Sequence, residues 1–197
     1  MYQNSKENKL VLGASLLIFS YAIARIVMVI FDFYLTNFDS STYQTYAVIW
    51  KIGFFINCIG FLSLISISEI AIFKKKSRFL ISIFYLIFLI ISIIPMNIQL
   101  VQLISIVPSA FAMIFVPLTY LYLARYDTIR KRALAIFVGY VIFFVGATLL
   151  AEDLVQGFIA LNPSNALNIR STIHITSIGL KIGGMLFLVY GYRKKLV

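Results

Sequence analysis

Six ionisable side chains stand inside otherwise apolar stretches of this sequence, and these are the residues that could do chemistry. Arg25 and Asp32 are seven residues apart, and Lys51 and Glu69 are eighteen apart, so each pair shares one helix face. His174 and Lys181, also seven apart, share a third face. With two nearby glutamines, the candidate ligand-binding or pore-lining residues are Arg25, Asp32, Lys51, Glu69, Gln99, Gln102, His174 and Lys181.

Charged groups inside a bilayer cost at least about 2.5–3.5 kcal/mol each, so they usually face a bundle interior or a wet cavity. One interpretation is therefore a protein that binds or translocates a small solute or ion through a polar interior. Three cations, Arg25, Lys51 and Lys181, favour an anionic ligand unless Asp32 and Glu69 neutralise them. The alternative is a non-transporting sensory or assembly subunit of a membrane complex, in which the charges only fix helix packing.

The sequence offers little support for catalysis. His174 is the only histidine and Cys58 the only cysteine, which leaves too few ligands for a zinc site built from these residue types. No Gly-x-Ser-x-Gly elbow and no phosphate-binding glycine loop is present. We therefore predict that the protein is not an enzyme, and that it has no catalytic residues, no metal site and no cofactor.

Composition indicates an integral membrane protein. Hydrophobic residues make up 61% of the 197 residues, charged residues only 12%, and the mean hydropathy is +0.98. A soluble domain is about 45–50% apolar and about 25% charged, so this chain could not cover its apolar surface in water. We expect one transmembrane domain over residues 1–197, in the cell membrane of a microbe. The polar N-terminus and the first apolar run, which lacks a small-residue cleavage site, predict an uncleaved first span.

Six apolar stretches predict an all-α bundle of six transmembrane helices. They cover approximately residues 10–35, 45–73, 79–94, 98–124, 133–150 and 172–190. In the long loop between the last two, Leu154, Phe158, Ile159 and Leu161 predict a short amphipathic segment on the outer surface.

The net charge of +10 is distributed as expected for membrane loops and not for a nucleic-acid-binding face. Thirteen of the seventeen basic residues fall in four clusters that apolar spans separate from one another, and the intervening loops are nearly free of them. Under the positive-inside rule, this alternation puts both termini in the cytoplasm. The clusters are Lys6 and Lys9; Lys74, Lys75, Lys76 and Arg78; Arg125, Arg130, Lys131 and Arg132; and Arg193, Lys194 and Lys195.

The expected partners are the lipid bilayer and a small solute or ion. A second copy of the chain and a partner membrane subunit are both open as further partners. Nucleic acid is not expected.

Two short segments match at an offset of 88 residues. Residues 34–40 and 122–128 both fit Tyr-Leu-x-x-aromatic-Asp-Ser/Thr. The same offset carries the first three spans roughly onto the last three. Three spans per unit would invert the second copy, so the match is compatible with a 3+3 inverted repeat like those of many transporters.

Two resemblances follow from size and position. Six spans in about 200 residues with cytoplasmic termini resemble the substrate-binding subunits of energy-coupling-factor importers. Ser20 and Ala24 are similar to the small-residue coupling face of their first helix, although the alanine pair itself is absent. Lys181 in the last span resembles a retinal-binding lysine, but that family has seven spans, this chain has one tryptophan, and Ser177 replaces the expected carboxylate.

Overall fold

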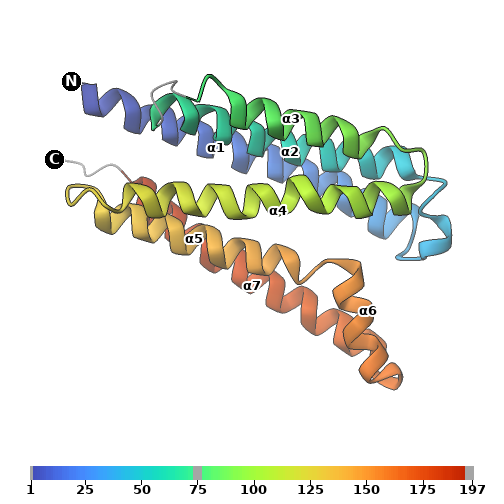
Figure 1. Cartoon of the computed structure of the whole chain (residues 1–197). Helices are drawn as coiled ribbons and strands as arrows, with labels where there is room; N and C mark the ends of the chain where they lie inside the picture. The colour runs from blue at the N-terminus through green and yellow to red at the C-terminus, as the bar shows by residue number, and fades with distance from the viewer. Residues whose placement is uncertain (1, 73–76, 194–197) are drawn as a thin grey trace. The chain divides into compact units, whose positions relative to one another are not determined.

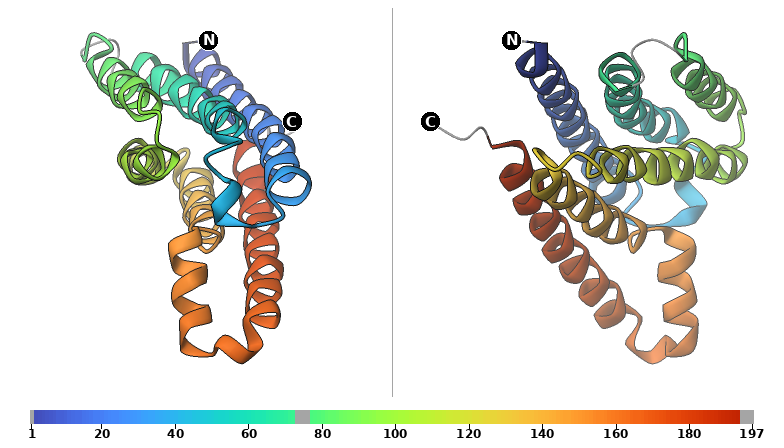
Figure 2. Two further views of the ribbon diagram at one scale, coloured as in Figure 1. Left: turned by 90° about the vertical axis from the view of Figure 1, so that its right-hand side faces the viewer. Right: turned by 60° about the vertical axis from the view of Figure 1, so that its left-hand side comes forward.

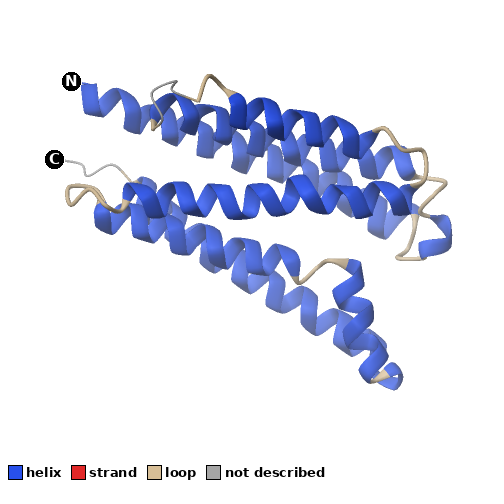
Figure 3. Ribbon diagram, viewed as in Figure 1, coloured by secondary structure: helices blue, strands red, loops and turns tan. Residues whose placement is uncertain are grey.

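The computed structural model describes residues 2–72 and 77–193, and this part of the chain consists of helices joined by loops, with no strand (Figure 3). Phe73, predicted to end the second span, lies outside the described residues, as do the basic residues Lys74–Lys76 and Lys194–Lys195. In chain order the helices are α1 (Tyr2–Val29), the π-helical η1 (Ile30–Leu35), the 3-10 turn η2 (Ser40–Thr42), α2 (Ala47–Ala71), α3 (Leu80–Ile93), α4 (Ile98–Leu123), α5 (Arg130–Thr148), α6 (Glu152–Leu161), the 3-10 turn η3 (Pro163–Asn165) and α7 (Ala166–Tyr192) (Figure 1).

Five of the described helices are long and apolar enough to cross a membrane, which makes this a multi-pass membrane protein. They are α1 with η1, α2, α4, α5, and α7 with η3. The sixth predicted span, residues 79–94, forms the apolar but shorter α3. At 1.5 Å per residue, its 14 residues reach only about 21 Å, less than the roughly 30 Å of the hydrocarbon core. All six predicted segments are thus helical, and the number of crossings stays a prediction.

The chain divides into two compact units within α4, the first ending at Ala112 and the second beginning at Met113. A single transmembrane domain stays a prediction.

In the first unit, α1 packs along α2, and α3 packs on α2. Small residues bring α1 and α2 close together. A Cβ atom added at Gly60 would lie 2.9 Å from the Cβ of Ser20 and 3.2 Å from the Cα of Leu17. Ala14, on the same helix as Leu17, is also buried. Apolar helices attract each other in lipid mainly through such close contact, so these positions fix the pair.

A small apolar cluster lies where η1, the start of α2 and the start of α4 meet. Its buried members are Phe31, Tyr43, Ala47 and Ile98. Gln44 joins the same elements, because its amide donates to the carbonyl of Met96 (3.0 Å) and accepts from the N–H of Ile98 (2.9 Å). The loop before α2 therefore closes the free N-terminal turn of α4.

In the second unit, α5 and α7 form the closely packed pair. A Cβ atom at Gly184 would lie 2.7 Å from the carbonyl oxygen of Gly139, and one at Gly139 would lie 2.9 Å from that of Gly184. One heptad along, the hydroxyl of Ser177 donates to the carbonyl of Gly146 at 2.6 Å. Small residues thus let the two backbones touch, as they do in many membrane helix pairs.

The predicted amphipathic segment is confirmed as helix α6. Val155 is buried, whereas Leu154, Phe158 and Leu161 are 42%, 45% and 83% exposed. Figure 2 shows α6 running from the end of α5 to the turn that starts α7. Exposed apolar side chains on a short amphipathic helix are typical of a segment lying in the membrane interface.

The packing inside the units bears on the 88-residue repeat. That repeat would make α4 and α5 the counterparts of α1 and α2. The closely packed pair of the second unit is instead α5 with α7. The inverted repeat stays a prediction, without support from these pairings.

Candidate binding site

Glu69, one of the predicted site residues, caps a helix. It is 1% exposed, and its carboxylate accepts hydrogen bonds from the N–H groups of Ile81 (3.2 Å) and Ser82 (2.8 Å) and from the Ser82 hydroxyl. These N–H groups belong to the first turn of α3, which has no partners for them within the helix. A negative charge there is also favoured by the helix dipole. The buried carboxylate therefore completes α3.

The turn that brings α3 to Glu69 is unusual. Arg78 and Phe79 both have positive φ angles, of 47° and 61°. This left-handed conformation strains the backbone of residues that have a Cβ atom. It persists where surrounding contacts stabilise it. The hydrogen bonds of Glu69 to Ile81 and Ser82, just after this turn, are such contacts.

Lys51 lies at the other end of α3. Its ammonium group donates to the carbonyl oxygen of Pro95 at 2.5 Å, just after α3 ends at Ile93. A cation is favoured at the C-terminus of a helix, where carbonyl groups are left without partners. The prediction that Lys51 and Glu69 point the same way is confirmed, because Glu69 contacts the first turn of α3 and Lys51 contacts Pro95, just after its last turn.

The two charges explain how a short helix can be placed in a membrane. The ends of a 14-residue helix would expose polar backbone groups to hydrocarbon, at a cost of several kcal/mol each. Lys51 and Glu69 are eighteen residues apart, about 27 Å along α2. This separation matches the length of α3 with its end turns.

In the first unit the side chains of the remaining predicted residues are more exposed than that of Glu69. Arg25 and Asp32 are half-buried, and Asp32 lies in the π-helical η1. Gln99 is exposed, and Gln102 is half-buried with its backbone carbonyl accepting from Ser105 at 2.6 Å. A role for these four in binding stays a prediction.

In the second unit, Lys181 is 8% exposed and lies on α7 beside the contact with α5. A Cβ atom at Gly146 would lie 3.2 Å from its Cγ, so the lysine stem packs against this glycine. His174, two turns earlier on α7, is half-buried. Their role in ligand binding also stays a prediction.

Three tyrosines gather at the opposite end of α7. The hydroxyl of Tyr192 hydrogen-bonds to those of Tyr120 and, at 3.3 Å, Tyr140. The rings of Tyr120 and Tyr140 stack with their centroids 5.6 Å apart. Tyr120 and Tyr140 are each 1% exposed, so this cluster links α4, α5 and α7 by buried polar contacts.

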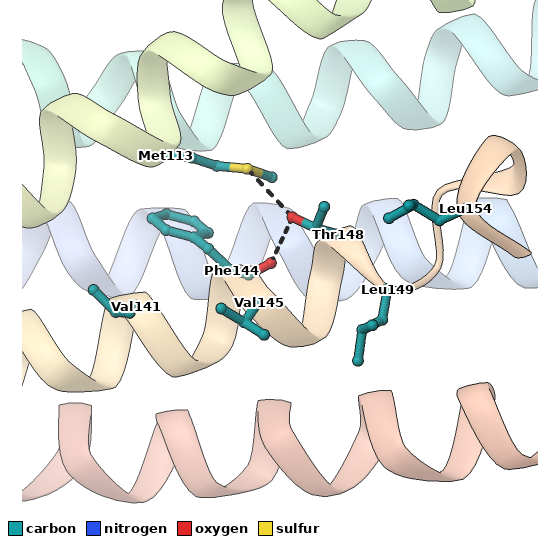
Figure 4. A pocket seen from close by; sticks show the side chains of 7 residues that line it. All are labelled: Met113, Val141, Phe144, Val145, Thr148, Leu149 and Leu154. Atoms are coloured by element: carbon teal, nitrogen blue, oxygen red, sulfur yellow. Dashed lines mark hydrogen bonds between the residues drawn. The ribbon is translucent and has the colours of Figure 1, made fainter. Parts of the chain in front are cut away.

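Two hollows open on the second unit. The first, of about 330 Å³, is almost entirely apolar, and its one hydroxyl, on Thr148, is already hydrogen-bonded to the carbonyl of Phe144 at 2.9 Å (Figure 4). The Thr148 hydroxyl also lies 3.8 Å from the sulfur of Met113. The lining residues are Met113, Val141, Phe144, Val145, Thr148, Leu149 and Leu154. We call this the apolar crevice.

The second hollow, of about 500 Å³, lies between α6, η3 and the first turns of α7, and we call it the amide hollow. Five of its lining residues carry an uncharged amide or hydroxyl group, and none carries a charge. Its size is within the roughly 300–1,000 Å³ of small-molecule sites, and it is open, because all five of these polar residues are exposed. The lining residues are Leu149, Phe158, Asn162, Asn165, Asn168, Ile169, Thr172, Ile173 and Thr176.

None of the eight predicted site residues lines either hollow. The sequence does carry a signal for the amide hollow, because Asn162, Asn165, Asn168, Thr172 and Thr176 recur every three or four residues. On α7 that spacing puts Asn168, Thr172 and Thr176 on one helix face, while Asn162 and Asn165 lie in the turn before it. It is easily overlooked, since amides and hydroxyls are common in loops and the lining also requires Phe158 from another helix.

Among the described residues, groups of histidine, cysteine and carboxylate side chains that could hold a metal ion are absent. Comparison with known proteins does not assign a function: the chain matches no protein-family model, no curated protein and no solved structure.

Proposed function

We propose that this multi-pass membrane protein binds a small, uncharged polar solute in the amide hollow. The observation that carries the proposal is the convergence of three asparagines and two threonines with Phe158 in one hollow. Amide groups both donate and accept hydrogen bonds, as do hydroxyls, so they suit a ligand with both kinds of group. Without a lysine or arginine in the lining, an anion has no particular advantage there.

The proposal includes six crossings with both termini in the cytoplasm of a microbial cell. The loop that holds the amide hollow then faces outward. This topology can be tested with single cysteines in a Cys58→Ala background, since Cys58 is buried. An impermeant thiol reagent added to intact cells should label Ser164→Cys and should not label Thr128→Cys. Labelling of Thr128→Cys from outside would overturn the topology.

A thermal-shift screen of the purified protein tests the binding proposal. The probes are polyols, monosaccharides, small amides, amino acids and inorganic anions, because any ligand specific for the native state raises apparent stability. We expect shifts with uncharged polyols or sugars, lost in Asn168→Leu and kept in Ser171→Ala, whose side chain is outside the lining. Shifts with anions alone, unaffected by Asn168→Leu, would overturn it.

A second candidate is the non-transporting sensory or assembly subunit. It is favoured by Lys51 and Glu69, whose contacts with the ends of α3 fit a packing role. Uptake into proteoliposomes separates transport from binding alone: a probe that stabilises the protein without entering vesicles supports a binding or sensory subunit.

A further inference from the structure

We infer that the ligand of the second unit is an amphiphile whose sugar-like headgroup occupies the amide hollow and whose chain occupies the apolar crevice. The inference rests on the proposed binding at the amide hollow and names the class of molecule bound there. It is carried by the pairing of two hollows of opposite character on one unit.

Leu149 lines both hollows, so the two are neighbours. Helix α6 also borders both, because Leu154 lines the apolar crevice and Phe158 lines the amide hollow. A single molecule lying against α6 can therefore reach the two linings. A small polar solute would contact only the amide hollow, and a pure hydrocarbon would contact only the apolar crevice.

The polar lining defines the headgroup. The side-chain amides of Asn165 and Asn168 make no hydrogen bond to another described residue, so they are available to a ligand. Asn162 is partly engaged, since its side-chain oxygen accepts from the Ser164 hydroxyl at 2.8 Å. Sugar hydroxyls donate and accept, which matches amides and threonine hydroxyls. A phosphate headgroup would call for cationic donors that the lining does not contain.

The apolar lining defines the tail. Met113, Val141 and Val145 offer aliphatic contact, and the Thr148 hydroxyl is satisfied within its own helix. Methionine adapts its shape readily to an irregular chain. Such a lining suits an acyl chain, because it has no free hydrogen-bonding group for a polar ligand.

The experiment uses the full chain in nanodiscs of phosphatidylcholine doped with a monoglucosyl diacylglycerol, with retained lipid read by native mass spectrometry. Parallel samples contain phosphatidylglycerol or free glucose as the probe. We expect the protein to retain glucosyl diacylglycerol in preference to both phosphatidylcholine and phosphatidylglycerol. The double variant Asn165→Leu/Asn168→Leu should lose this preference by roughly tenfold or more, the effect of about 1.4 kcal/mol.

Val145→Trp should fill the apolar crevice and reduce retention of glucosyl diacylglycerol by a similar factor. Val138→Trp is the matched control, because Val138 is on the same helix and partly exposed but outside the lining. Circular dichroism and a monodisperse elution profile verify that each variant is folded.

The outcomes separate this inference from the proposed function. If free glucose binds through Asn168 and Val145→Trp changes nothing, the solute proposal holds and the amphiphile is overturned. If lipid is retained without regard to headgroup or to the asparagines, it is bulk lipid at an apolar surface, which overturns the inference. If glucosyl lipid is not retained and no uncharged solute of the thermal-shift screen binds, both proposals fail.

Discussion

Lys51 and Glu69 on α2 lie at opposite ends of α3, the ammonium on the carbonyl of Pro95 and the carboxylate on the N–H groups of the first turn. Each charge complements the dipole end that it meets. Two intramembrane charges that could have lined a solute path thus hold a short helix against a long one. Their removal gives the first predictions.

Glu69→Gln should destabilise the protein by about 1.5–3 kcal/mol, the usual range for hydrogen bonds to a charged group. The amide keeps one acceptor but turns a donor toward N–H groups that need an acceptor. The midpoint of thermal unfolding in detergent measures the effect. Asp127→Asn is the control, because this carboxylate is 96% exposed and its ion pair with Arg130, at 4.0 Å, is worth about 0–1 kcal/mol. Equal stability of the two variants would contradict the capping role.

Combining Lys51→Met with Glu69→Gln should give additive losses, within about 0.3–0.5 kcal/mol. The two groups act on opposite ends of α3, about 27 Å apart along α2, and share no partner. A double-mutant cycle of unfolding free energies measures the coupling. A larger interaction energy would show that the two charges act on each other or on one shared ligand.

Gly184→Ala should destabilise the α5–α7 pair by about 1–3 kcal/mol, the usual cost of overpacking. Its new methyl group would lie 2.7 Å from the Gly139 carbonyl and 2.8 Å from the backbone nitrogen of Phe143, neither of which can move independently. Gly183→Ala meets nothing within 4 Å, so it should be neutral or stabilising through helix propensity. Unfolding midpoints of the two variants provide the test, and similar midpoints would argue against close backbone contact.

Tyr192→Phe should cost about 1–3 kcal/mol, because it leaves the buried hydroxyls of Tyr120 and Tyr140 without their common partner. Tyr190→Phe is the control, as Tyr190 is 64% exposed and two residues away on the same helix. The comparison again uses unfolding midpoints in detergent. A greater loss in Tyr190→Phe would contradict the hydroxyl cluster.

Much of the helical organisation could be predicted from local pattern. The apolar stretches predicted every long helix, because hydropathy is a property of the chain itself. The eighteen-residue spacing predicted that Lys51 and Glu69 share a face, since a helix repeats at a fixed angle. The amphipathic spacing likewise predicted α6, and it is a helix.

The roles of those residues could not be predicted in the same way. Whether a shared charged face meets a solute or the two ends of another helix depends on which helix packs there, and periodicity within α2 does not contain that information. The amide hollow also depends on how different helices are placed. The turn η3 redirects the chain so that Phe158 of α6 lies with Asn168 and Thr172 of α7. By itself the sequence determined a membrane protein with charges on defined faces. Only the tertiary structure decided what those faces touch, because contacts between segments depend on turns and packing far from each residue.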